Sequence, residues 1–222
     1  MKKMEAASVY AAPNSQLLEK PSIPATFLGG TLNSSRMKFA GWMTIIYLSL
    51  FSVVSIISVA EGFLAENIFI EYTDWISGIV LLAIWIYLIL TLKTLLNRRF
   101  EHNGSDLYIK LLIGCSILET SAALLMDLKG NGADTYMFTY FAFVFIAGVI
   151  SVLFGKSLLA VKCRYSGLNL YAWSEIALGV CMVTVIFYIV IGIPITIVAC
   201  IGMAKIFFNA ASELSFISEN AE

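Results

Sequence analysis

The residue most suited to chemistry is Glu119, a carboxylic acid inside an apolar stretch. It lies near the centre of residues 107–127, with no basic residue within one helical turn. An ionised carboxylate in a hydrocarbon layer is costly unless it is protonated, paired across helices or in contact with water. Ser116 shares its helical face and Thr120 adjoins it. We interpret these three residues as a candidate proton or ion site. The competing interpretation is a protonated acid that holds helices together by hydrogen bonds.

No other residue pattern indicates catalysis, a cofactor or a metal. The sequence has no phosphate-binding loop, no nucleophile elbow and no zinc-protease motif. Its only histidine is His102, and its four cysteines form no closely spaced pair. The net charge of −1 gives no reason to expect nucleic acid as a partner. We therefore expect a protein that is not an enzyme and has neither cofactor nor metal.

The composition predicts that a lipid bilayer surrounds this candidate site. Hydrophobic residues make up 59% of the chain and charged residues 13%, compared with about 25% charged residues in ordinary soluble domains. The apolar residues form runs of roughly 18 or more, which is the helix length that crosses a ~30 Å hydrocarbon core. The fold class that we predict is all-α, a polytopic membrane helical bundle.

We expect six transmembrane helices arranged as three hairpins. The predicted spans are 38–60, 75–96, 107–127, 136–161, 172–191 and 194–211, within a membrane domain at 37–211. Residues 1–36 are predicted to be a mobile cytoplasmic tail and residues 212–222 a second tail. The last two spans divide one apolar run at Gly192 and Pro194, which together are typical of a helix end and a new start. Without that division, the run would be one long kinked helix.

Basic residues predict the orientation, because Lys and Arg collect in cytoplasmic loops. With a cytoplasmic N-terminus, every Lys and Arg except Lys129 lies on the cytoplasmic side. Lys93, Lys156 and Lys205 each precede similar strings at the ends of the even-numbered spans, so we place them at the cytoplasmic boundary, where they reach the headgroups. The similarity fits an internal threefold repeat or a shared boundary constraint equally well.

Three further features complete the predicted bundle. Gly148 and Gly155 lie on one face of span 136–161 and predict a helix-packing seam. Glu175 is interpreted as an interfacial acid at the start of the fifth helix, where it favours the helix N-terminus. An acidic outer loop either attracts cations or only reflects the exclusion of basic residues; it holds Glu61, Glu66, Glu71 and Asp74.

Short strings at both ends of the bundle carry a resemblance. They are Lys38-Phe-Ala-Gly-Trp-Met43, Ile193-Pro194 and Lys205-Ile-Phe-Phe-Asn-Ala-Ala211. These strings resemble those of uncharacterised small bacterial multi-pass inner-membrane proteins. The resemblance implies a location in the inner (plasma) membrane and implies nothing about activity.

Two functions fit these features. The sequence favours a non-catalytic accessory, scaffold or assembly subunit that contacts other membrane proteins or forms a homo-oligomer, because few polar groups face the bundle. The alternative is a small ion- or proton-coupled transporter or channel that uses Glu119, since transporters are often built from repeats around a midplane site. A polar cavity that reaches Glu119 would favour transport, and a dry, fully packed environment would favour the scaffold.

Overall fold

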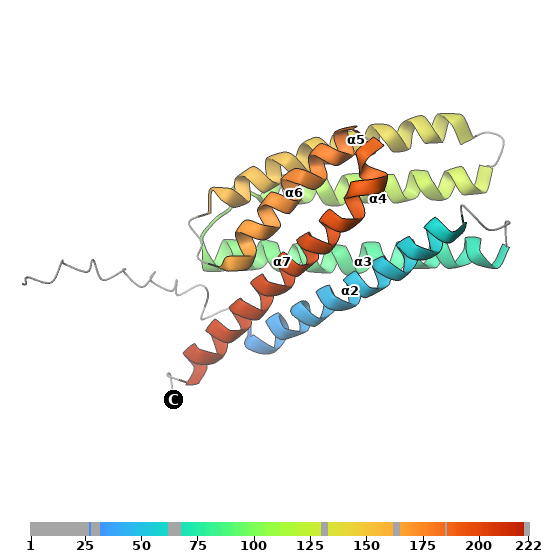
Figure 1. The fold of residues 1–222 in the computed structure, drawn as a ribbon. Helices are drawn as coiled ribbons and strands as arrows, with labels where there is room; N and C mark the ends of the chain where they lie inside the picture. The colour runs from blue at the N-terminus through green and yellow to red at the C-terminus, as the bar shows by residue number, and fades with distance from the viewer. Residues whose placement is uncertain are drawn as a thin grey trace, which may run out of the picture.

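Six α-helices form the structure, a computed structural model that describes residues 27, 32–61, 68–129, 133–161, 165–184 and 186–219 (Figure 1). The prediction of an all-α chain with six helices is confirmed within these ranges. The helices are α2 (Ser34–Glu61), α3 (Ile68–Arg99), α4 (Asp106–Lys129), α5 (Ala133–Leu159), α6 (Ser166–Thr184) and α7 (Ile186–Glu219).

Among the described residues, five of these helices are long and apolar enough to cross a membrane. Their spans are Ser34–Ile57, Ile76–Arg99, Asp106–Leu125, Met137–Leu159 and Ile191–Glu219. Large apolar side chains face outward from them, as Ile56 and Phe138 do with 69% and 77% exposure. By the length and composition of its helices, the chain is a multi-pass membrane protein. The remaining helix, α6, is the shortest of the six, with 19 residues, and buries Ser174 and Glu175.

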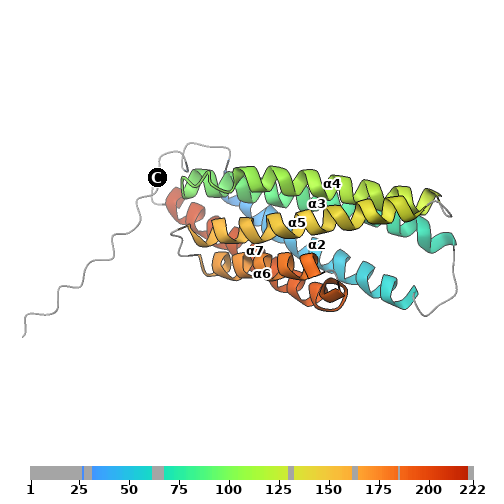
Figure 2. The same ribbon diagram turned by 90° about the horizontal axis from the view of Figure 1, so that it is seen from above.

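The helices form a closed ring. Each packs against its neighbours along the chain, and α7 returns to pack against α2. The closest packing joins α6 to α5 and to α7, whereas α3 packs most loosely against its neighbours α2 and α4. The helices run roughly along one common direction (Figure 2). A ring of this kind leaves room for a cavity at its centre.

The start of α2 and the end of α7 lie at the same end of the bundle, which we call the terminal end (Figure 1). The Ser34 hydroxyl donates a hydrogen bond of 3.0 Å to the carbonyl of Ala211 there. Most of the predicted tail 1–36 lies outside the described residues, but α2 already begins at Ser34. At the other terminus, α7 continues past residue 211 to Glu219.

The predicted boundary at Gly192 and Pro194 is wrong. α6 ends at Thr184 and α7 begins at Ile186, so α7 runs through both residues as one helix. Proline removes a single backbone donor, and side chains of neighbouring turns can satisfy local backbone groups within a membrane. The carbonyl that loses its donor is that of residue 190, one turn before Pro194, and the backbone on both sides stays helical. One missing backbone bond is therefore not enough to end this helix.

The predicted acidic loop is shorter than expected. Because α3 begins at Ile68, Glu71 and Asp74 belong to its first turns and not to a loop. The side chains of these residues and of Glu61, and the whole of Glu66, lie outside the described part of the chain.

The two ends of the ring are packed differently. The terminal end holds the main apolar core, which includes Leu92, Leu95, Phe154 and Phe207 with no exposed surface. Toward the opposite end, the far end, no described side chain of α2 after Thr44 is buried, and none of α3 before Leu88. The ring is thus closed by packed side chains at the terminal end and looser toward the far end.

Candidate functional site

A central cavity of about 250 Å³ lies inside the ring and is lined by residues of all six helices. That volume has room for roughly eight water molecules at ~30 Å³ each. Ser116, Glu119 and Thr120, the candidate ion site predicted from the sequence, all lie on its wall. A cavity therefore adjoins Glu119, and its wall combines a few polar groups with a mostly apolar surface.

Glu175 is the second carboxylic acid on the cavity wall. Its interpretation as an interfacial acid at a helix start is wrong, because α6 begins at Ser166 and Glu175 lies in the middle of the helix. The first turn of α6 lies nearer the N-terminus than the predicted start at residue 172. The amide of Leu168 donates a hydrogen bond of 3.0 Å to the carbonyl of Tyr165 there. Only 8% of Glu175 is exposed. The cavity thus brings together one acid from α4 and one from α6.

Helix α5 supplies a hydroxyl to each acid. Tyr140 lies within hydrogen-bonding reach of Glu119, and Ser151 within reach of Glu175. A hydroxyl can donate to a carboxylate or accept from a carboxylic acid, so these contacts suit either charge state. No Lys, Arg or His lines the cavity, and neither acid takes part in an ion pair among the described residues.

Tyr171 has an unusual place beside Glu175. It precedes the acid by one helical turn, its side chain is 2% exposed, and it lines the cavity. Its hydroxyl is directed near Glu175 but makes no hydrogen bond of normal geometry with any described protein atom. A buried hydroxyl without a partner costs free energy, about 1–3 kcal/mol. Among the described residues, the Tyr171 hydroxyl thus approaches Glu175 without a bond of normal geometry.

Aromatic and thioether side chains form much of the remaining wall. Tyr47 and Phe51 of α2 and Trp85 of α3 contribute rings, and Met182 of α6 and Met203 of α7 contribute sulfur-containing chains. The cavity accordingly combines two acids with a soft, apolar surface. Sequence reasoning did not identify this combination, because its members are scattered over five helices.

The three predicted boundary lysines do not reach the cavity. Lys93 forms an ion pair of 3.0 Å between its Nζ atom and an oxygen of Asp106. Lys156 and Lys205 are exposed. None of the three lines the cavity wall, so none neutralises Glu119 or Glu175.

The two predicted packing glycines face α6. A Cβ atom on Gly148 would lie 2.8 Å from the carbonyl oxygen of Gly179, and one on Gly155 would lie 2.7 Å from that of Ala172. These distances are too short for any side chain, so glycine is what lets α5 and α6 approach this closely. This contact holds α6, and with it Glu175, against the cavity.

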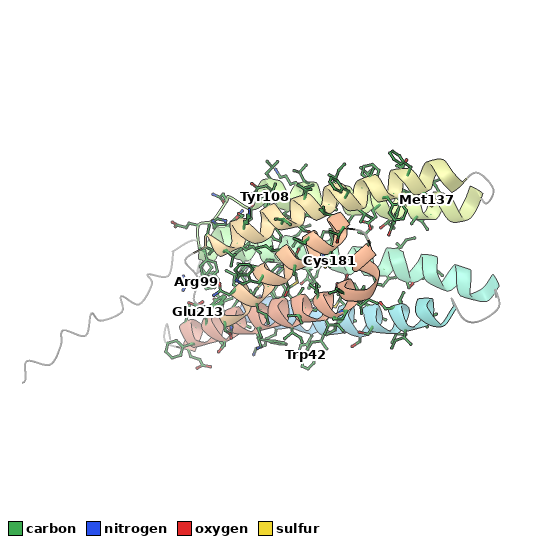
Figure 3. All side chains as sticks on the ribbon, turned by 45° about the horizontal axis from the view of Figure 1, so that its top comes forward. Trp42, Arg99, Tyr108, Met137, Cys181 and Glu213 are labelled. Carbon is green, nitrogen blue, oxygen red and sulfur yellow. The ribbon has the colours of Figure 1, made fainter. Side chains whose placement is uncertain are left out.

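An ion pair that the sequence did not reveal lies at the terminal end. The guanidinium of Arg99 binds both carboxylate oxygens of Glu213, with its Nη2 atom 2.7 Å from Oε1 and its Nε atom 3.0 Å from Oε2. The Tyr165 hydroxyl donates a further hydrogen bond to Glu213. Figure 3 shows Arg99 and Glu213 side by side at this end. We call these three residues the terminal cluster.

Burial and charge define the terminal cluster. Arg99 is 7% exposed, and the rings of Phe27 and Phe100 lie 5.6 Å and 5.3 Å from its guanidinium carbon. Burial raises the pKa of Tyr165 well above its usual range, and the bond to Glu213 adds to this effect. The cluster joins the end of α3 to α7 and to the residue before α6. It therefore links α3, α7 and the start of α6 at the terminal end.

No protein-family model, no curated protein and no solved structure matches this chain. The resemblance to small bacterial inner-membrane proteins stays a prediction.

Proposed function

We propose that this protein is a small membrane transporter or channel that takes up a cation, the proton included, at Glu119 and Glu175. The observation that carries the proposal is the shared cavity of these two acids, and no basic residue lines it in the part of the chain that the structure describes. Both lie in the middle part of their helices, which corresponds to the depth where transporters bind their substrates.

Electrostatics supports a positive occupant. Each carboxylate is costly to ionise in a low-dielectric cavity without a counter-charge. A proton or a cation removes that cost. An acid that only joins helices needs no space beside it, whereas Glu119 adjoins a cavity of about 250 Å³. The cavity therefore favours uptake of a cation over a purely structural role for the acid.

We further propose that both termini lie in the cytoplasm of a bacterium and that the protein belongs to its inner membrane. The described basic residues support this orientation, since Arg36, Lys38, Arg98, Lys110 and Lys156 all belong to helix ends at the terminal end. In this orientation the packed core and the terminal cluster close the cavity toward the cytoplasm. The looser far end then faces the outside.

The accessory or scaffold function favoured by the sequence stays a prediction. It depends on partners, and no feature of the cavity is needed for it. The lipid bilayer is the one surrounding that the five candidate spans imply directly.

Ion flux through reconstituted vesicles tests the proposal. The full chain is placed in liposomes that contain a pH-sensitive dye, a potassium gradient with valinomycin drives protons inward, and sodium-22 uptake is measured in parallel. We expect a flux of protons or sodium above that of protein-free liposomes. Glu119→Gln and Glu175→Gln should lower it by roughly tenfold or more, because both remove the charge and keep the shape. Glu219→Gln, an exposed acid at the end of α7, is the matched control and should not change it.

Two results would contradict the proposal. One is a flux equal to that of protein-free liposomes for both ions, with protein that elutes as a folded species. The other is a wild-type flux that survives both substitutions in the cavity.

A further inference from the structure

We infer that the cation bound by the cavity is an organic one, an ammonium-type group that carries an aromatic or alkyl body. This inference rests on the proposed function and names its substrate class.

The wall is poorly suited to a bare metal ion. Calcium takes six to eight oxygen ligands and magnesium demands a near-ideal octahedron. Among the described residues there is no group of three or more His, Cys, Asp or Glu side chains that could hold a metal ion. The cavity of about 250 Å³ also far exceeds the space of a dehydrated ion. A solute that brings its own bulk fills this space better.

The aromatic side chains of the wall suit an organic cation. A positive charge within about 6 Å of an aromatic ring is attracted by the ring face, and the attraction grows when water is excluded. Tyr47, Trp85 and Tyr171 supply such rings from three helices, on the same wall as the two acids. Met182 and Met203 supply flexible apolar chains that adapt to irregular shapes. The wall thus offers both charge neutralisation and apolar contact to one molecule.

The Tyr171 hydroxyl lies beside Glu175 on the cavity wall. It is buried, lines the cavity and lacks a hydrogen bond of normal geometry within the described protein. A ligand that bears N–H groups, or a water that it carries, would provide the missing partner.

An apolar pocket adjoins the cavity between α2 and α3. It measures about 280 Å³ and is lined by Leu50, Ile76, Ser77, Val80 and Leu81. Leu81 lines the cavity as well, so one side chain stands between the two spaces. Since α3 packs loosely against its neighbours, this is where a molecule dissolved in lipid would reach the cavity. The apolar body of the cation would pass or remain here while its charge rests near the acids.

Trp85 provides a direct reading of binding, because it lines the cavity whereas Trp42 and Trp173 are exposed. The full chain with Trp42, Trp75 and Trp173 replaced by Phe, in lipid nanodiscs, is titrated with benzyltrimethylammonium. Its neutral isostere neopentylbenzene is titrated in parallel, and empty nanodiscs correct for partition into lipid. We expect a saturable change in Trp85 fluorescence with the cation, and affinity lower by roughly tenfold or more for the isostere.

Substitutions locate the site within the protein. Glu119→Gln and Glu175→Gln should each weaken binding of the cation by roughly tenfold or more. Gly78→Leu should abolish it, because Gly78 lines the cavity and no atom lies within 4 Å of a Cβ placed there. Gly114→Leu is the matched control: a Cβ there also meets no atom within 4 Å, but Gly114 does not line the cavity. This control should bind like the parent protein.

Several outcomes overturn the inference. Equal binding of cation and isostere would show that charge is not recognised, and binding that survives Gly78→Leu would place the site elsewhere. If the protein conducts protons or sodium but does not bind benzyltrimethylammonium, the proposed function stands and this inference fails. If it neither conducts nor binds, both fail.

Discussion

Replacing Gly179 by alanine tests whether close contact between α5 and α6 supports the cavity wall. A Cβ atom on Gly179 would lie 2.5 Å from the carbonyl oxygen of Gly148 and 2.9 Å from the backbone nitrogen of Val152. Both are backbone atoms, so no side-chain rotation relieves the clash. The two helices have to move apart, and α6 carries Glu175 with it.

The expected change in the free energy of unfolding is the sum of two opposing effects. Overfilling a well-packed interior costs about 1–3 kcal/mol. Replacing glycine by alanine within a helix stabilises by about 0.5–1 kcal/mol, because the unfolded chain loses conformational freedom. We expect Gly179→Ala to lower the free energy of unfolding by about 1 kcal/mol, the difference between the midpoints of these two ranges. Gly114→Ala has only the favourable effect, since no atom lies within 4 Å of its Cβ position.

The assay is unfolding of both variants in one mild detergent, followed by circular dichroism as temperature or sodium dodecyl sulfate concentration rises. Gly179→Ala should unfold before the wild type, and Gly114→Ala should unfold with it or after it. The reasoning is refuted if Gly179→Ala unfolds at or beyond the wild-type midpoint. Opposite shifts of two identical substitutions exclude a general effect of alanine.

Three further predictions concern the terminal end. Arg99→Met should lower the free energy of unfolding by more than the ~1 kcal/mol of a surface ion pair but less than the ~3–5 kcal/mol of a fully buried one, since Glu213 is partly exposed. The same variant should raise proton leak in the liposome assay, and an unchanged leak would show that the terminal cluster does not close the cavity. Lys93→Met should cost at most about 1 kcal/mol in the same unfolding assay, because both partners of its ion pair are partly exposed. Tyr165 should make stability fall as pH rises above ~10, where the unfolded tyrosine ionises while the raised pKa keeps the folded one protonated. The free energy of unfolding, measured as a function of pH, should fall less above pH ~10 in Tyr165→Phe than in the wild type.

The sequence predicts the helices well because a membrane constrains them strongly. A backbone in lipid must satisfy its own hydrogen bonds, so a long apolar run has to be helical. The boundary between α6 and α7 is the exception. Gly192 and Pro194 are typical helix breakers in water, but α7 runs through both residues as one helix, because a single missing backbone bond is tolerated between packed membrane helices. The prediction from local propensity therefore placed the last helix boundary too far along the chain.

The candidate site was only half predictable. Glu119 stands out because an acid in an apolar run is costly wherever it points. Glu175 does not, because its role depends on where α6 begins and on which helix faces it. The terminal cluster is harder still, since Arg99 and Glu213 are 114 residues apart. Only the return of α7 to the start of the ring brings such residues together.

Helix α6 connects these observations. It is the shortest of the six helices, and its two glycines let both neighbouring helices approach it closely. Gly179 meets α5, and Gly167 lies so near α7 that a Cβ there would stand 2.5 Å from the carbonyl oxygen of Gly202. Held on both sides, α6 can turn Glu175 and Tyr171 only inward. The composition of this helix is thus explained by the cavity, and a wall built this tightly around two acids is a reason to expect that the cavity has an occupant.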